Sequence, residues 1–99
     1  MIRNAMAAAG LLVAVASPAA AGDTSKGVIL ALSCAACHGP DGASPGSIPA
    51  IDRLKPSEIE AALKAFRADT RPATVMGRIA KGYSDAEIGL LSGQFGRGR

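Results

Sequence analysis

Five consecutive residues, Cys34-Ala35-Ala36-Cys37-His38, contain both cysteines and the only histidine of this 99-residue chain. A C-x-x-C-H run of this kind is the pattern by which a haem is attached to a protein. Two thiols three positions apart on a helical turn can form thioethers with the two vinyl groups of one haem, and the adjacent imidazole can bind the iron. The motif therefore predicts a fold arranged around one large, covalently held group.

The first 21 residues have the pattern of a cleaved secretory signal. Arg3 gives a positive start, Ala5 to Ala16 form an apolar stretch of 12 residues, and Ala19-Ala20-Ala21 is a small-residue pattern that a signal peptidase cuts. The stretch is too short for a membrane anchor, because crossing a hydrocarbon core takes about 20 apolar residues. We therefore expect export to the periplasm, a mature chain that begins at Gly22, and no membrane anchor after cleavage.

The remaining part, residues 22–99, is too small and too poor in aromatic residues to build a core from its side chains alone. Its 78 residues include no Trp, one Tyr and two Phe, and a core of this size is marginal without a disulfide, a metal or a cofactor. A haem would itself fill the centre. Without Arg3 the formal charge falls from +3 to +2, and there is no basic run. We therefore expect no nucleic-acid partner.

Three other uses of the two cysteines and the histidine fit the sequence less well. A structural zinc site needs four ligands, and the chain offers only three side chains of these types. A thioredoxin-like redox pair is expected in a βαβ setting, of which the sequence shows no sign. A disulfide between Cys34 and Cys37 is allowed in an exported protein, but it would close a tiny loop and leave the small core unexplained. Haem attachment agrees with the motif, the export signal and the small core together.

Three amphipathic helices and no strands are predicted, each with apolar residues at the spacing i, i+3, i+4, i+7 or part of it. Their apolar faces are Gly27, Leu30, Ala31 and Cys34 in the first, Ile59, Ala62, Leu63 and Phe66 in the second, and Ile88, Leu91 and Phe95 in the third. The expected N-terminal caps are Asp23, Thr24 or Ser25 for the first helix, and the capping boxes Ser57–Glu60 and Ser84–Glu87 for the other two.

The segments between these helices are long for so small a domain. Residues 39–55 are rich in Gly, Pro and Ser, and a loop of this length is unusual unless it wraps something. Residues 72–81 are predicted to be a loop that leads into a short helix. The expected fold is therefore all-α, with three main helices and long loops around one covalently bound haem c, in a single domain at residues 22–99.

The second axial ligand of the iron follows by elimination. Met1 and Met6 leave with the signal, so Met76 is the one methionine of the mature chain. No second histidine exists to pair with His38. Ordinary core packing of Met76 and an open or water-ligated iron are the alternatives. With His38 and Met76 as metal ligands, both axial sites are filled and the reduction potential is raised, so we expect electron transfer and no catalysis at the iron.

The order of these features resembles that of class I c-type cytochromes: an N-terminal motif, a proline about a dozen residues later, and a late methionine before a final helix. The resemblance covers nearly the whole mature chain and implies the small cytochrome c fold. It implies that the carbonyl of Pro49 accepts a hydrogen bond from the imidazole of His38 and orients it, the alternative being an ordinary loop residue. It also implies that the first and last helices cross, by position at Gly27, Leu30, Leu91 and Phe95.

A narrower resemblance is to the cytochrome subunit of flavocytochrome c sulfide dehydrogenase. It rests on the run from Met76 to Ser84 and on the shorter runs Cys37 to Gly39, Asp41 to Ser44 and Ile48 to Ile51. That family implies a periplasmic subunit of the single-haem type. Such a subunit docks on an FAD-containing flavoprotein that oxidises sulfide, and it passes electrons to a downstream acceptor such as another cytochrome. On this interpretation the chain is not an enzyme by itself.

Two other functions share the same chemistry and differ in partner. One is a free soluble cytochrome that shuttles electrons between respiratory complexes, and the other is an electron-accepting subunit of another dehydrogenase. Arg78 and Lys81 lie close to Met76 in the sequence. They could form a docking rim, contact a haem propionate or belong to a solvated turn.

Overall fold

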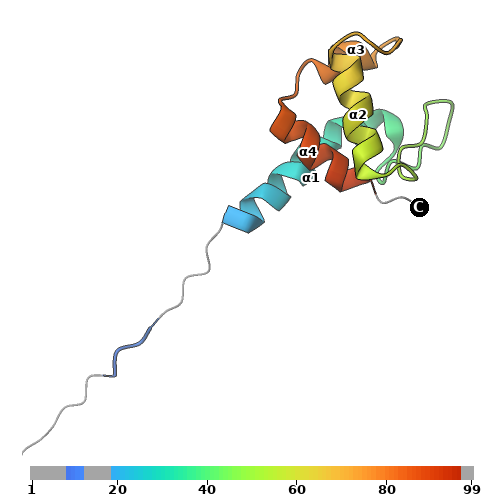
Figure 1. The fold of residues 1–99 in the computed structure, drawn as a ribbon. Coiled ribbons are helices and arrows are strands. Elements are labelled where there is room, and N and C mark those ends of the chain that lie inside the picture. Colours follow the sequence, from blue (N-terminus) through green and yellow to red (C-terminus); the bar gives the residue numbers. More distant parts are fainter. Residues whose placement is uncertain (1–8, 13–18, 97–99) are drawn as a thin grey trace, which may run out of the picture.

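The computed structural model describes residues 9–12 and 19–96, with the side chains of the first helix described from residue 25 onward. The helices in these ranges are α1 (Ala19–His38), α2 (Pro56–Arg67), α3 (Met76–Ala80) and α4 (Asp85–Phe95), and no strand occurs there (Figure 1). The all-α prediction is confirmed. The short helix α3 lies where the sequence predicted a loop leading into a short helix.

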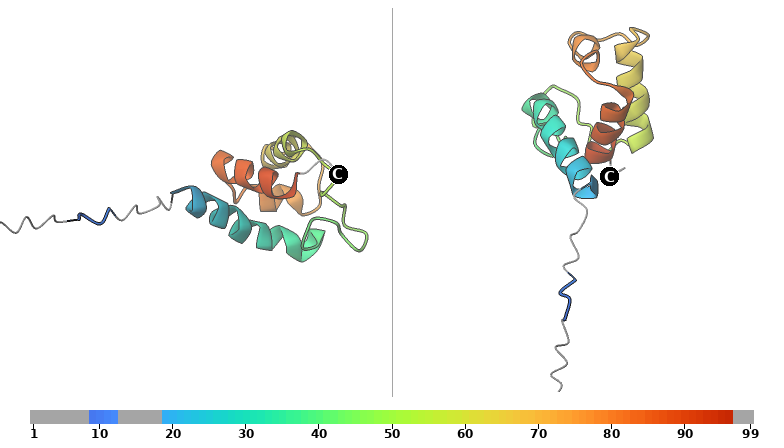
Figure 2. Two further views of the ribbon diagram at one scale, coloured as in Figure 1. Left: turned by 90° about the horizontal axis from the view of Figure 1, so that it is seen from below. Right: turned by 90° about the vertical axis from the view of Figure 1, so that its left-hand side faces the viewer.

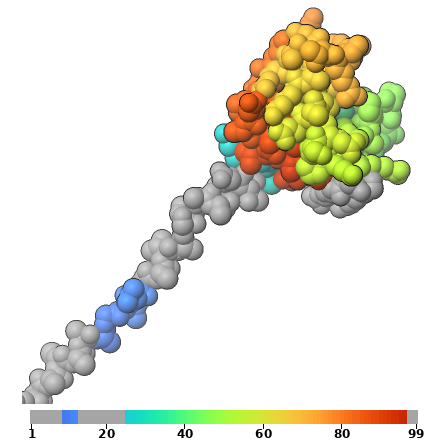
Figure 3. Space-filling view, viewed as in Figure 1, coloured from blue at the N-terminus to red at the C-terminus, as the bar shows by residue number. Residues whose placement is uncertain are grey.

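Most of the predicted signal, residues 1–21, lies outside the described residues. Its described part at residues 9–12 runs away from the helices (Figure 3) and adds nothing to the core, since Leu11 and Leu12 are 89% and 98% exposed.

Helix α1 begins earlier than predicted, at Ala19. The cap candidates therefore lie inside the helix in the full chain, because the alanines that precede them are strong helix formers; these candidates are Asp23, Thr24 and Ser25. Cleavage after Ala21 would leave them in the first turn. The helix ends with the cysteine motif, where Gly39 adopts a left-handed conformation with φ 88° that stops the helix.

Helix α2 begins at Pro56, and its predicted capping box is wrong. Proline suits the first position of a helix, because its fixed φ is helical and its missing N–H has no partner to lose there. The helix therefore starts ahead of Ser57, and Glu58 becomes the residue whose carboxylate accepts a hydrogen bond from the N–H of Lys55, at 3.2 Å. Glu60 forms a surface ion pair further along the helix.

The capping box predicted for α4 is confirmed. The N–H of Glu87 donates to Ser84 Oγ at 3.2 Å, and the N–H of Ser84 donates to the Glu87 carboxylate at 3.0 Å. The start of this helix is also tied to the end of α2, since Arg67 forms an ion pair with Asp85 and donates to the carbonyl of Tyr83 at 3.1 Å. These contacts fix the segment that connects α3 to α4.

Helix α4 packs against both α1 and α2, and α3 packs against α2 (Figures 1 and 2). The predicted contact between the first and last helices is confirmed, and the atoms of α4 nearest to a Cβ on Gly27 belong to Leu90 and Gln94. A Cβ on Gly27 would lie 3.8 Å from both Leu90 Cβ and Gln94 Oε1. Leu91 and Phe95 are instead turned further inward, where they border the centre of the fold. The buried apolar residues are Ala31, Ile59, Leu63, Ala80, Ile88, Leu91 and Phe95.

Candidate functional site

A cavity of about 580 Å³ lies between the C-terminal end of α1, the helices α2 and α3, and the loops that join them. Most of its wall is apolar, and Leu54, Ile59, Leu63 and Phe66 contribute to it. Folded proteins contain few voids larger than a water molecule, whereas sites for small molecules and cofactors typically measure about 300–1,000 Å³. The space therefore has the dimensions of a cofactor site, in the position where a larger domain would have its core.

The end of α1 places both cysteines on the wall of this cavity. Cys34 is half-buried, Cys37 is exposed, and both thiols are free. Burial raises the pKa of the Cys34 thiol, which disfavours the thiolate that a redox-active or metal-binding cysteine needs. The described residues contain no group of three or more His, Cys, Asp or Glu side chains that could bind a metal ion. These observations favour neither the zinc site nor the thioredoxin-like pair.

His38 lines the same cavity, and its orientation is set by a hydrogen bond from Nδ1 to the carbonyl of Pro49 at 2.6 Å. This bond was predicted and is confirmed. A carbonyl oxygen can only accept, so Nδ1 has the proton and the lone pair of the neutral ring is on Nε2. The loop that provides the carbonyl is itself tied down, because the N–H of Ser44 donates to His38 O and the N–H of Ile51 donates to Gly42 O, both at 2.7 Å. The imidazole is thus prepared to bind a metal through Nε2.

Met76 is the first residue of α3 and also lines the cavity. Its side chain is partly buried and packs against the core. The structure therefore brings all four predicted site residues to one cavity; they are Cys34, Cys37, His38 and Met76. The first three come from the end of α1, whereas Met76 comes from a separate element 38 positions after His38 in the sequence.

Arg71 is a residue of the cavity wall that the sequence did not reveal. Its guanidinium carbon lies 4.9 Å from the centre of the Phe66 ring, a distance at which a cation is attracted to an aromatic face. The residue lies in a loop without periodicity, so no pattern marks it. Of the two cations that were considered instead, Lys81 is engaged by Asp69, and Arg78 is not among the residues lining the cavity.

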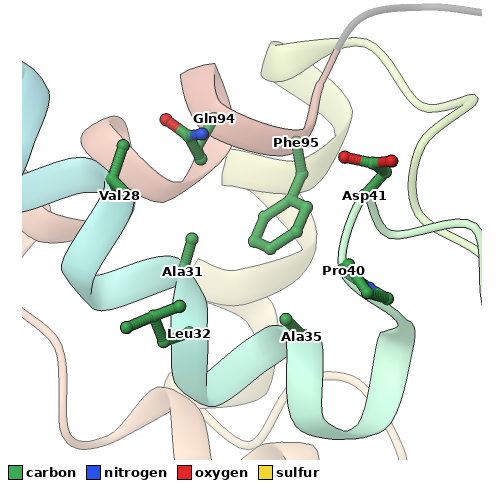
Figure 4. A pocket seen from close by; sticks show the side chains of 8 residues that line it. All are labelled: Val28, Ala31, Leu32, Ala35, Pro40, Asp41, Gln94 and Phe95. Atoms are coloured by element: carbon green, nitrogen blue, oxygen red, sulfur yellow. The ribbon is translucent and has the colours of Figure 1, made fainter.

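A second, smaller cavity of about 110 Å³ lies between α1, α4 and the turn at Pro40 and Asp41 (Figure 4). Phe95 borders both cavities and so forms part of the wall between them. None of the four site residues contributes to this smaller space. It is a gap in the packing of α1 against α4, whereas the larger cavity contains the chemistry.

Comparison with known proteins agrees with this geometry. Residues 23–91 match the family described as Cytochrome c. This chain belongs to the cytochrome c family. A curated relative, the cytochrome subunit of sulfide dehydrogenase from Chlorobaculum tepidum, is 53% identical over 72 residues. The match covers 73% of this chain and 66% of the relative, so the chain spans a little under two thirds of that protein's length. The resemblance to that subunit family is confirmed.

Family membership establishes the cofactor as a covalently bound haem c and the chain as an electron-transfer haem protein that is not an enzyme by itself. The cavity fits this cofactor in its volume, in its two thiols at C-x-x-C spacing and in its oriented imidazole. Within residues 9–12 and 19–96, none of the helices has the length and apolar character needed to span a membrane.

Proposed function

We propose that this protein is a periplasmic, single-haem cytochrome that accepts electrons from a sulfide-oxidising flavoprotein and passes them to a downstream acceptor such as another cytochrome. Cys34 and Cys37 would hold the haem through thioethers, and His38 and Met76 would bind its iron. The observation that supports this assignment best is that one cavity is lined by both thiols, the only imidazole and the only methionine sulfur of residues 22–99.

The chain's own residues have distinct tasks in this function. The haem, when bound, supplies a one-electron couple at its iron. The carbonyl of Pro49 keeps the His38 ring in one tautomer and orientation. Apolar side chains such as Leu63 and Phe66 keep water from the cavity. An apolar environment that excludes water from the haem and a thioether ligand to the iron would both favour the reduced iron, so the protein is suited to accept electrons.

An apolar surface at the edge of the cavity supports a docking site for the flavoprotein. Ile48, Val75 and Ile79 are apolar residues of the cavity wall. Ile48 comes from the loop over residues 39–55, whereas Val75 and Ile79 both come from α3 and its N-cap, so the fold brings two segments of the chain together here. Contact with a partner at this edge of the cavity would bring a donor close to the haem.

The periplasmic location is supported by the signal pattern of residues 1–21 and by the exposure of Leu11 and Leu12, which contribute nothing to the folded domain. Cleavage after Ala21 would remove them. The mature chain would then be residues 22–99, the domain that contains the complete candidate site.

The partner can be tested by isolating the cytochrome from its native periplasm at moderate salt. We expect a flavin-containing protein to co-purify, and sulfide to reduce the haem rapidly in that complex but slowly in the isolated cytochrome. Val75→Asn should slow the reduction in the complex, whereas Ile29→Asn, which changes an exposed apolar residue of α1 outside the cavity, should leave it unchanged. A cytochrome that runs as a free monomer at every salt concentration would contradict the proposal and favour the shuttle function.

The ligand assignment has its own test. Met76→Ala should abolish the weak far-red charge-transfer band of the oxidised protein, lower the reduction potential and open the iron to external ligands. An unchanged spectrum in this variant would rule Met76 out as a ligand, whatever the partner.

A further inference from the structure

Helix α3 begins with Met76 and is only five residues long. A helix of this length is not stable by itself in water, so contacts with the rest of the protein have to hold it in place. Its C-terminal end is anchored by Ala80, which is completely buried. Its N-terminal end, where Met76 lies, needs a separate anchor, because Val75 provides no side-chain cap there.

The C-terminus of α2 lies against this end of α3 and has an unusual conformation. The N–H of Asp69 donates to Phe66 O at 3.2 Å, and the N–H of Thr70 donates to Ala65 O at 3.0 Å. This is the Schellman pattern, in which the residue after the helix is left-handed and most often glycine. Here that residue is Asp69, with φ 56°. A left-handed aspartate is less favourable than glycine, so its side chain is expected to compensate.

The Asp69 carboxylate does so by binding Lys81. Lys81 Nζ lies 2.6 Å from Asp69 Oδ1 and also donates to the carbonyl of Gly77 at 3.2 Å. The carboxylate lies against the start of α3, since a Cβ at Gly77 would be in ordinary van der Waals contact with Asp69 Oδ1, at 3.6 Å. One ammonium group therefore links the end of α2 to the residue that follows Met76. We call this pair of contacts the Asp69–Lys81 clamp.

We propose that the Asp69–Lys81 clamp is a positioning device for Met76: it holds the start of α3 so that the sulfur stays on the cavity wall, and it thereby strengthens the sulfur–iron bond. The inference rests on the proposed ligation by Met76. The side chains of Lys81 and Asp69 are 48% and 71% exposed, so the contribution of their ion pair is modest and is screened by salt. Loss of the clamp should therefore let an external ligand compete better with Met76 for the iron, without displacing Met76 altogether.

The test uses the oxidised haem protein and imidazole as a competitor for the position of Met76. Asp69→Asn and Asp69→Gly should each tighten imidazole binding about 2- to 5-fold and weaken the far-red band at elevated temperature. Asp69→Gly separates positioning from stability, since glycine suits the left-handed site and should keep the denaturation midpoint unchanged or raise it. Glu60→Gln is the matched control, because it breaks the 2.9 Å ion pair with Lys64 on the surface of α2 and should change neither property.

Salt provides a further readout. Sodium chloride at about 1 M should tighten imidazole binding to the unmodified protein, because it screens the clamp, and should have little effect on the Asp69 variants. Imidazole affinities that are unchanged in both Asp69 variants would overturn the proposal, as would an effect equalled by Glu60→Gln. If Met76→Ala leaves the far-red band intact, the ligation itself is wrong. If Met76→Ala abolishes the far-red band but the Asp69 variants bind imidazole as the unmodified protein does, the ligation by Met76 stands and only the clamp is wrong.

Discussion

The structure predicts a large loss of stability for Gly42→Ala, in the loop over residues 39–55. Gly42 has φ 76°, a left-handed conformation that alanine adopts at a cost of about 1–2 kcal/mol. The space around it is also filled. A Cβ would lie 2.8 Å from Ile51 Cγ1 and 3.1 Å from Phe95 Cδ1, and overpacking of this kind costs about 1–3 kcal/mol.

The two costs together predict a loss of about 2–5 kcal/mol in the free energy of unfolding. That is a large share of the roughly 4–12 kcal/mol expected for a domain of this size. Gly46→Ala is the matched control in the same loop, because nothing lies within 4 Å of its added Cβ and its φ is not positive. We expect this control to change stability by no more than about 0.5 kcal/mol.

Guanidinium unfolding of the oxidised haem protein, followed by helical circular dichroism and by haem absorbance, measures both variants. The displaced Ile51 belongs to the loop that also contains Pro49, so Gly42→Ala should in addition lower the midpoint at which the haem spectrum changes. Equal midpoints for Gly42→Ala and Gly46→Ala would show that the loop is not packed as described, and would refute this reasoning.

Three further predictions concern charge and the cofactor. Hydrogen bonds from Ser84 lower the pKa of Glu87, and Arg67 lowers the pKa of Asp85. The two carboxylates therefore stabilise the fold above pH about 4, and this stabilisation is lost as the pH falls further. Glu87→Gln combined with Asp85→Asn should flatten the acid limb of a stability–pH curve. Arg71→Gln should lower the reduction potential measured by redox titration, because a cation on the cavity wall favours the reduced iron. Cys34→Ala with Cys37→Ala, without haem, should lose most helical circular dichroism, since the 580 Å³ cavity then has no occupant; a cooperative thermal transition in that protein would contradict this.

The parts of the site that the sequence predicts well depend on local chemistry. The thiol spacing at Cys34 and Cys37 and the capping box at Ser84 each involve few residues and few alternatives. Met76 lies on the cavity wall as expected, and its role as an iron ligand stays a prediction. The hydrogen bond to Pro49 was implied by family resemblance, because nothing in a loop sequence shows where its carbonyl points.

The parts that were missed depend on tertiary contacts. The start of α2 moved because a proline at the first helical position outweighed a plausible serine cap. The nearest neighbours of Gly27 in α4 are Leu90 and Gln94, which depends on how the two helices cross. The partners of Lys81 could not be predicted, since Asp69 is 12 positions away in the sequence and reaches Lys81 only through a left-handed turn.

Intact mass under denaturing conditions shows directly whether a haem is attached to Cys34 and Cys37. The protein would be purified from a host that attaches haem to exported cytochromes. We expect one species, with the mass of residues 22–99 plus one haem, and the haem should remain after acid–acetone extraction. Replacing Cys34 and Cys37 with alanine should yield the same chain without haem. A mass without haem, a haem removed by extraction, or a species that differs by the loss of two hydrogens through a disulfide would contradict this expectation.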